Sequence, residues 1–352
     1  AQESLIQAER DLVYAVRDFE EFRLRFCVDV ATRYYDLLQQ QAQLENQRRQ
    51  VANFEWLYHR TEALATAGRV PFFEVQRAEQ QVLFARNNLL NGSERYATSV
   101  AAFKLFIGMP ADDLLAIVPT ELVVPTPALE VTQSIATALA NRLDFQTAFD
   151  RVDDARRRVV VARDRMRGDL TAFASLSVAT DEDKQYGGLN FDLGQGDYEV
   201  GMRYSLPLDR RQEELAHRQA LVTLEQRDRS YTLLRDQIIS DVRRSIRQIE
   251  QAVFTLELQN RNIEVADKRL RGVLLRLQNL DTRDFIDAQG DLLEARNRRD
   301  AAMRDLRVNI LQYLINTGQL RITSQGQWQA PAQLVPVAAG PAPDAPADPA
   351  RL

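Results

Sequence analysis

The residues with the clearest capacity for chemistry are charged side chains that gather at two breaks between helical segments. The first break is Gly68-Arg69-Val70-Pro71, and the second is Leu280-Asp281-Thr282-Arg283. The charged residues that form or follow these breaks are Arg69, Glu74, Arg283, Asp284, Asp287 and Asp291. Acidic side chains near a helix start interact favourably with the helix dipole, so an ordinary solvated surface is one interpretation. Repeated in several copies, the same carboxylates would instead hold a strong negative field that favours cations.

The sequence offers no set of residues for catalysis or for holding a cofactor. The two histidines, His59 and His217, are far apart in the sequence, and neither has a cysteine or a second histidine at the spacing of metal ligands. No Ser/His/Asp or Cys/His arrangement suggests a nucleophile, and the chain lacks the two Glu-x-x-His motifs, one on each of two helices, that carboxylate-bridged metal proteins use. Gly194-Gln195-Gly196 lacks the strand-turn-helix setting of a phosphate loop. We therefore expect no enzyme activity, no cofactor and no metal.

The composition predicts an ordered, mainly helical chain. Its 352 residues include only 14 Gly and 12 Pro, and 45% are hydrophobic against 27% charged. The net charge of −5 does not favour nucleic acid, which calls for a basic face. No run of apolar residues is long enough for a membrane-spanning helix. Cys27 is expected to be a buried small hydrophobe rather than a reactive thiol.

The chain repeats itself at a distance of about 210 residues, which indicates a duplicated module. Ala85-Arg86-Asn87 recurs as Ala295-Arg296-Asn297, and Gly108 matches Gly318. Each copy also carries apolar residues at every seventh position, which is typical of long coiled-coil helices. These residues are Val30, Leu37, Leu44, Val51 and Tyr58, and then Val242, Ile249, Leu256, Ile263, Leu270 and Leu277. Two antiparallel helical hairpins are predicted, over 8–66 with 72–107 and over 211–277 with 283–316, with shorter helices over 129–141 and 144–166.

Between the copies the pattern changes to strict alternation, which predicts two strands over 170–178 and 198–206. Each strand is about ten residues long, the length that crosses a bilayer as a tilted barrel strand. The face expected to meet lipid consists of Tyr198, Val200, Met202, Tyr204 and Leu206. Glu199 and Arg203 would face the barrel lumen. One hairpin leaves unsatisfied edges in lipid, so strands from other chains must complete a closed barrel. A soluble sheet packed on a core is the alternative.

In this order of elements the chain resembles the TolC-like outer-membrane efflux factors over about residues 10–322. The strongest local marks are Tyr204-Ser205-Leu206-Pro207-Leu208 and the segment from Asp281 to Ala288, with Gly68 to Gln76 as its first-copy equivalent. The resemblance implies a homotrimer with a long antiparallel coiled-coil α-helical barrel and a transmembrane β-barrel to which each chain contributes its hairpin. Family members carry a further helix and a first β-hairpin before the part that starts here, and we expect these to be missing from this sequence. The opening Ala1-Gln2-Glu3 is expected to be a mature or truncated start.

The resemblance also divides the chain and assigns its sites. Residues 1–120 would form the first-repeat hairpin, 121–168 a linker with ascending helices, 169–208 the transmembrane hairpin with an extracellular loop, 209–322 the second-repeat hairpin, and 323–352 a disordered Ala/Pro-rich tail. Asp287 matches the first of two gate aspartates at the periplasmic entrance, whereas Gly290 stands at the second. The gate candidates are Asp287, Glu74, Arg283, Asp284 and Asp291, with the solvated-surface interpretation still open for the acids. The candidates for adaptor contact at the tips are Gly68, Arg69, Val70, Pro71, Phe72, Asp281 and Thr282. Packing between neighbouring hairpins is the alternative for Phe72 and Phe73.

These features together predict the outer-membrane channel of a tripartite efflux or export system in a Gram-negative-type bacterium. It would be a passive conduit across the periplasm that works with a periplasmic adaptor (membrane fusion protein) and an inner-membrane pump, in contact with outer-membrane lipid. The alternative is a soluble periplasmic coiled-coil scaffold or adaptor. An adaptor would need a lipoyl-like or β-barrel domain between its helical arms, and the two short predicted strands are too few for one.

Overall fold

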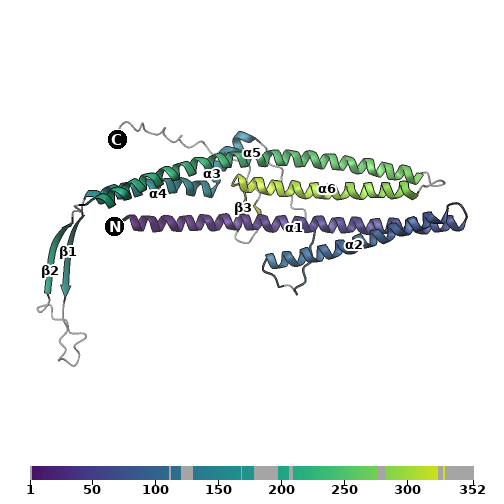
Figure 1. The fold of residues 1–352 in the computed structure, drawn as a ribbon, viewed down its shortest axis with the longest axis horizontal. Helices are drawn as coiled ribbons and strands as arrows, with labels where there is room; N and C mark the ends of the chain where they lie inside the picture. Colours follow the sequence, from purple (N-terminus) through teal and green to yellow (C-terminus); the bar gives the residue numbers. More distant parts are fainter. Residues whose placement is uncertain are drawn as a thin grey trace, which may run out of the picture. The chain divides into compact units, whose positions relative to one another are not determined.

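The computed structural model describes residues 2–110, 112–119, 130–167, 169–177, 197–205, 209–275, 282–323 and 328–329. The predicted fold class, mainly α with a small β part, is confirmed (Figure 1). The first half contains α1 (Gln2–Thr66), α2 (Phe72–Phe106), α3 (Val131–Asn141), α4 (Leu143–Asp164) and a short 3-10 turn, η1 (Arg165–Arg167). The second half contains β1 (Asp169–Ser177), β2 (Asp197–Ser205), α5 (Arg211–Leu275), α6 (Thr282–Asn316), β3 (Arg321–Ile322) and β4 (Trp328–Gln329). Each predicted helix and strand is present, and the predicted ends at 178, 206 and 277 lie outside the described residues.

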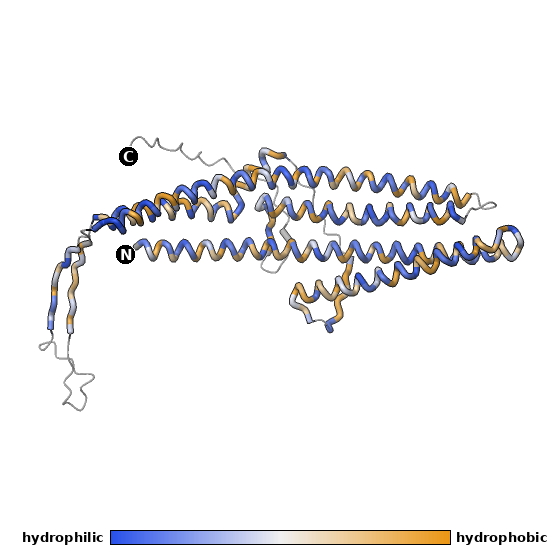
Figure 2. Tube along the Cα trace, viewed as in Figure 1, coloured by the Kyte–Doolittle hydropathy of each residue, from blue (hydrophilic) through white to orange (hydrophobic). Residues whose placement is uncertain are grey.

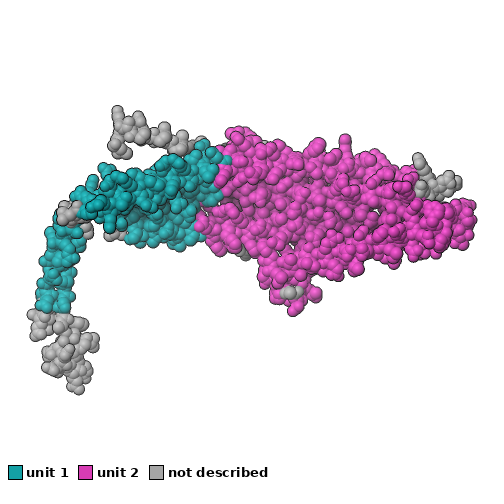
Figure 3. All heavy atoms as spheres, in the orientation of Figure 1, with its two compact units in different colours: residues 1–15, 144–236 teal, residues 16–143, 237–352 magenta. Residues whose placement is uncertain are grey.

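The chain divides into two compact units (Figure 3). Unit 1 comprises Ala1–Ala15 and Asp144–Asp236, and unit 2 comprises Val16–Leu143 and Gln237–Leu352. The long helices α1 and α5 therefore contribute one segment to each unit. Hydrophilic and hydrophobic residues are interleaved along every long helix (Figure 2). Among the described residues, no helix combines the length and the apolar character needed to cross a membrane.

In unit 1, α4 is joined to the N-terminal part of α1 by a partly buried network of polar and charged residues. The Tyr14 hydroxyl donates a hydrogen bond of 2.6 Å to the Oδ2 of Asp154, and both residues are buried. Arg157 donates to the other carboxylate oxygen of Asp154 at 2.9 Å and also pairs with Glu3 at 3.2 Å. Burial and the hydrogen bond to Asp154 raise the pKa of Tyr14 to about 12, because both disfavour a tyrosinate beside a carboxylate. These contacts fix the register between two helices that are far apart in the sequence.

The strands β1 and β2 form an antiparallel two-stranded sheet in unit 1, with Phe173 opposite Gly201 and Thr171 opposite Arg203. Because side chains alternate between faces, Leu170, Leu176 and the even-numbered residues of β2 share one face. That face is apolar and exposed: Tyr198 is 65% exposed, Val200 84%, Met202 80% and Tyr204 63%. Among the described residues, no further strand pairs with this hairpin.

Unit 2 contains two helical hairpins whose return helices match in length and in their ends. The helices α2 and α6 each span 35 residues. Two residues after the end of each helix stands a glycine with a positive φ angle, 75° at Gly108 and 64° at Gly318. At both ends the N–H of the residue after the glycine bonds back to the carbonyl five residues earlier, as in a Schellman cap. The glycines that the repeat aligned therefore perform the same structural task.

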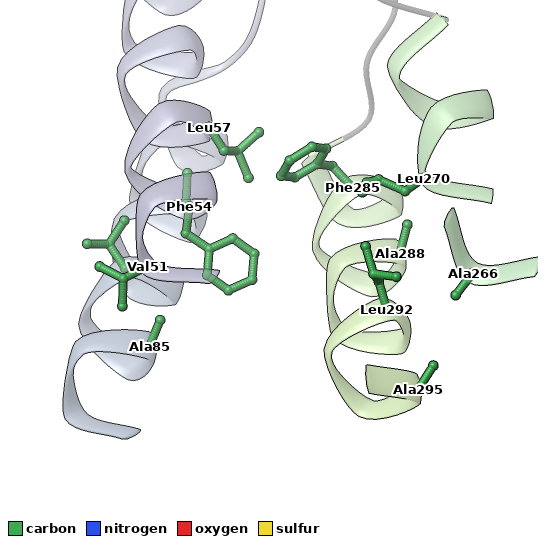
Figure 4. Packing of buried hydrophobic residues seen from close by; sticks show 12 residues of the cluster. Val51, Phe54, Leu57, Ala85, Ala266, Leu270, Phe285, Ala288, Leu292 and Ala295 are labelled. Carbon is green, nitrogen blue, oxygen red and sulfur yellow. The ribbon is translucent and has the colours of Figure 1, made fainter. Parts of the chain in front are cut away.

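The buried positions of the two return helices also follow the repeat. Ala78 and Ala288 are both fully buried, and Ala85 and Ala295 are 3% and 7% exposed. With Val82 and Leu292 they belong to one hydrophobic cluster that includes residues of all four long helices: Val51, Phe54, Leu57, Ala78, Val82, Ala85, Ala266, Leu270, Phe285, Ala288, Leu292 and Ala295. Phe54 and Leu57 of α1 point toward α6, where Phe285, Ala288 and Leu292 lie (Figure 4). Small alanines allow the helices to approach closely, while the larger residues fill the space between them.

Polar contacts between α1 and α6 hold the two hairpins in register. Arg304 donates to the carboxylate of Asp36 at 2.6 Å, and Asn53 donates to Gln289 at 3.1 Å.

The expectation that Cys27 is buried was wrong, because its side chain is partly exposed.

Candidate functional site

The turn between α1 and α2 is shaped by Gly68. This glycine has a φ angle of 69°, and the N–H of Arg69 bonds to the carbonyl of Leu64 at 2.9 Å. A residue with a Cβ is strained in that conformation, so the glycine allows the chain to leave the helix in a tight reversal. Pro71 occupies the N-cap position just before Phe72, with φ −72° and ψ 151°. The missing N–H of proline removes no helical hydrogen bond there.

The side chains of this first turn are mostly exposed. Arg69 and Pro71 are exposed and Val70 is partly buried. Phe72 and Phe73 are 70% and 54% exposed, so neither packs fully within the described chain. Large apolar side chains on a protruding turn are typical anchors for a partner protein.

At the second turn, one of the two predicted tip residues is buried. Thr282 is the first residue of α6 and is 5% exposed, so its side chain is not available at the surface of the described chain. Its burial follows from its position one turn before Phe285, on the face of α6 that packs into the hydrophobic cluster. Asp281, the other tip candidate of this turn, lies outside the described residues.

Three acidic gate candidates share one face of α6. Asp284, Asp287 and Asp291 are all exposed, and their spacing of three and four residues places them on the same side of the helix. Phe285 and Leu292, each the next residue along the helix, lie on the neighbouring buried face. The three carboxylates are therefore directed away from the cluster and form a short acidic stripe. Arg283, the first gate candidate of α6, is exposed as well.

Two of the acidic gate candidates, Asp291 and Glu74, form ion pairs. Asp291 pairs with Arg269 of α5. Glu74 pairs with Arg77 on its own helix at 2.9 Å, and only 15% of its side chain is exposed. Because that carboxylate is already paired and mostly covered, it contributes little to an exposed acidic surface. Asp284 and Asp287 form the exposed centre of the candidate site.

Sequence reasoning missed the residues of α1 that lie near the first turns of α6. The indole of Trp56 packs on Phe285 with ring centroids 5.6 Å apart, and the guanidinium of Arg60 lies 5.5 Å from the Trp56 ring. Trp56 is 45% exposed and lies between Phe54 and Leu57, two buried residues of the α1 stripe, so a wider definition of that stripe could have included it. The hydrogen bond between Asn53 and Gln289 left no such signal, because polar residues on a helix are usually solvated.

The expected lipid face of the β-hairpin has the exposure described above for Tyr198, Val200, Met202 and Tyr204. Leu206, its last predicted member, lies outside the described residues. Glu199 and Arg203 are on the opposite face, as their odd positions in the register require. Among the described residues, no group of three or more histidine, cysteine, aspartate or glutamate side chains could hold a metal ion.

The fold, two long helical hairpins with an inserted β-hairpin, is shared with solved outer-membrane channels. Residues 2–109 match the family model described as outer membrane efflux protein. Among solved structures, the chain is similar to the outer membrane protein VceC from Vibrio cholerae, with 17% identity and a TM-score of 0.77 over 90% of this chain and 75% of that one.

Two further solved channels have similar sequence identities and TM-scores. The outer-membrane channel OprN has 17% identity and a TM-score of 0.77, with 90% of this chain and 71% of that one covered. The open state of the MtrE outer membrane channel from Neisseria gonorrhoeae has 17% identity and a TM-score of 0.73, with the same coverage. A search of curated proteins gives no match. The family model over the first hairpin and the shared fold over most of the chain confirm the resemblance to the TolC-like proteins.

Proposed function

We propose that this chain is the outer-membrane channel of an efflux or export system. The observation that carries the proposal is the β1–β2 hairpin, whose apolar face exposes four large side chains of β2 and pairs with no other described strand. Such a face is costly in water, and the unpaired strand edges are costly in lipid. Both costs are relieved when hairpins from several copies close a barrel in a membrane. The family match over α1 and α2 and the fold of solved channels support the same conclusion.

The partners follow from this proposal. The channel would be a homotrimer in the outer membrane with its helices in the periplasm, and it would conduct passively. Energy would come from an inner-membrane pump, and a periplasmic adaptor would contact the helical tips. The exposed turn at Gly68, Arg69 and Pro71, followed by Phe72, is the contact that we propose for the adaptor. Exposed phenylalanine next to a rigid glycine–proline turn gives a protein partner an apolar anchor of fixed position.

A test of this function uses membranes of cells that express the full-length protein. A channel stays in the membrane fraction after a high-salt wash, needs detergent for extraction, and migrates as a trimer in mild detergent. A periplasmic scaffold would be released by salt. A monomer released by salt alone would refute the channel.

Selectivity at the tip would come from the acidic stripe of α6. In a trimer, Asp284 and Asp287 would be present three times around the entrance, together with Asp291 beside Arg269. Carboxylates gathered in this way attract cations and repel anions. Asp287 is the strongest candidate, because it is exposed and matches a gate position of the family, and Arg283 would adjust the field from one turn away.

Single-channel recording of the Asp287→Asn variant tests the gate. We expect lower cation selectivity or more frequent opening, since each subunit loses one negative charge at the entrance. Glu294→Gln is the matched control, because Glu294 lies two turns further along the same helix and pairs with Arg298. Equal conductance and selectivity in Asp287→Asn and the unmodified channel would exclude Asp287 from the gate.

A further inference from the structure

The polar face of the β-hairpin carries one packed cluster, formed by Phe173, Gly201 and Arg203. Phe173 and Gly201 are partly buried, whereas the other residues of the hairpin whose exposure is described are exposed. Phe173 lies directly opposite Gly201 in the register. A two-stranded sheet normally buries little on either face, so this spot differs from the rest of the hairpin.

Gly201 is present to make space rather than to allow an unusual backbone angle. The described glycines with a positive φ angle are Gly68, Gly108 and Gly318, and Gly201 is not among them. A Cβ placed on Gly201 would lie 2.6 Å from the Cζ atom of Phe173 and 3.0 Å from its Cε1 atom. The ring of Phe173 therefore lies across the backbone of the neighbouring strand. An aromatic ring over a cross-strand glycine covers the backbone that the glycine exposes.

Arg203 is held on this ring. The Cζ atom of its guanidinium lies 5.5 Å from the centroid of the Phe173 ring, within the range of a cation–π contact. The other charged positions on the polar face are Asp169, Asp197 and Glu199. Glu199 is four residues from Arg203 along β2, or about 13 Å at the rise of a strand. That separation exceeds the screening length of about 8 Å at physiological ionic strength, so Glu199 does not offset the charge of Arg203. Asp169 stands nearer, diagonally across from Arg203 in the register.

We propose that Arg203 determines charge selectivity in the barrel, with Phe173 and Gly201 positioning its guanidinium. The inference rests on the proposed channel function, because the polar face then lines the water-filled lumen. Each copy of the chain would contribute one fixed positive charge at the same height. This ring would oppose cations and favour anionic solutes, and would act in series with the acidic tip of α6.

The size of the effect follows from the Coulomb interaction. A unit charge about 6 Å from a permeating ion in water changes the local ion concentration about threefold. Loss of the charge raises the local cation concentration and lowers the anion concentration by that factor, so we expect the cation-to-anion permeability ratio to rise about tenfold in Arg203→Gln and about a hundredfold in Arg203→Glu. Arg203→Lys keeps the charge and should leave the ratio near that of the unmodified channel. Glu199→Gln, on the same face, should move the ratio in the opposite direction.

The experiment measures reversal potentials of the full-length channel in planar bilayers under a KCl gradient, after assembly of each variant is verified in mild detergent. Phe173→Leu should give a ratio between those of the unmodified channel and Arg203→Gln, because the guanidinium loses its support but keeps its charge. A value equal to that of the unmodified channel would remove Phe173 from the proposal. A conducting pore with an unchanged ratio in both Arg203→Gln and Arg203→Glu would overturn the inference and leave the channel intact. Failure of the unmodified protein to form any pore would refute the channel function as well.

Discussion

The buried hydrogen bond between Tyr14 and Asp154 allows a quantitative test of unit 1. The Tyr14→Phe variant removes a single hydroxyl and keeps the ring in place. Tyr14 is 6% exposed and Asp154 4%, and their oxygens are 2.6 Å apart, so the lost bond is buried and has a charged acceptor. Hydrogen bonds to charged groups contribute about 1.5–3 kcal/mol to stability.

The expected loss lies within that range because Asp154 keeps a second partner. Arg157 still donates to the carboxylate at 2.9 Å, and Arg10 lies 3.9 Å from it. The carboxylate is therefore not left as an unpaired buried charge, which would cost more. We expect the free energy of unfolding to fall by about 2 kcal/mol at pH 8. Chemical denaturation followed by circular dichroism of the detergent-solubilised protein measures this change.

The pH dependence provides an independent check on the same contact. The pKa of Tyr14 is raised to about 12 in the folded protein, from 10 for an unperturbed tyrosine. Its contribution to stability is therefore fully present below pH 10 and is lost as the pH rises toward about 12. The difference between the unmodified protein and Tyr14→Phe should shrink over that interval.

Tyr58→Phe is the matched control, because the Tyr58 hydroxyl also faces a carboxylate, that of Glu62, but at 3.4 Å and at the surface. This control should leave the free energy of unfolding unchanged. Equal stability of Tyr14→Phe and the unmodified protein at pH 8, or a difference that persists unchanged at pH 11, would refute the reasoning.

Two further predictions concern backbone and core. Gly318→Ala should destabilise the protein more than Gly68→Ala when both are measured by thermal unfolding. Both glycines have positive φ angles, which cost about 1–2 kcal/mol for a residue with a Cβ, but only at Gly318 would the new atom also meet Asn141, at 2.9 Å. Ala288→Leu should lower the free energy of unfolding by about 1–3 kcal/mol, since Ala288 is fully buried. Ala101→Leu, at an exposed position of α2, should leave it unchanged. Equal stability of the two leucine variants would contradict close packing at the tip.

Much of the fold could be predicted from periodicity. Val242 and Ile249, two members of the seven-residue stripe, are fully buried, as the pattern of the second copy requires. The alternation in β1 and β2 likewise predicted which residues share a face. Such patterns are readable because they depend on local geometry, namely 3.6 residues per helical turn and two per strand repeat.

The contacts between distant elements could not be predicted in the same way. The Tyr14–Asp154 hydrogen bond joins residues 140 positions apart, and nothing in either helix alone indicates that pairing. Thr282 looked like an exposed turn residue because its burial depends on how the start of α6 meets the hydrophobic cluster. Glu74 was predicted to be a gate acid, and its sequence spacing permits several ion pairs. Only the structure shows that its carboxylate pairs with Arg77. Membership of the candidate site therefore required the tertiary structure, whereas its location at the two turns did not.

The matched length of α2 and α6 limits how this architecture can change. Both helices have 35 residues, and their buried alanines stand at equivalent heights in one shared cluster. Inserting residues into one hairpin alone would offset its alanines from those of the other. An insertion that preserves the stripe must add whole heptads, each about 10 Å long, to the ascending and returning helix of both copies at once. The reach of the helical part should therefore evolve in discrete, coordinated steps rather than one residue at a time.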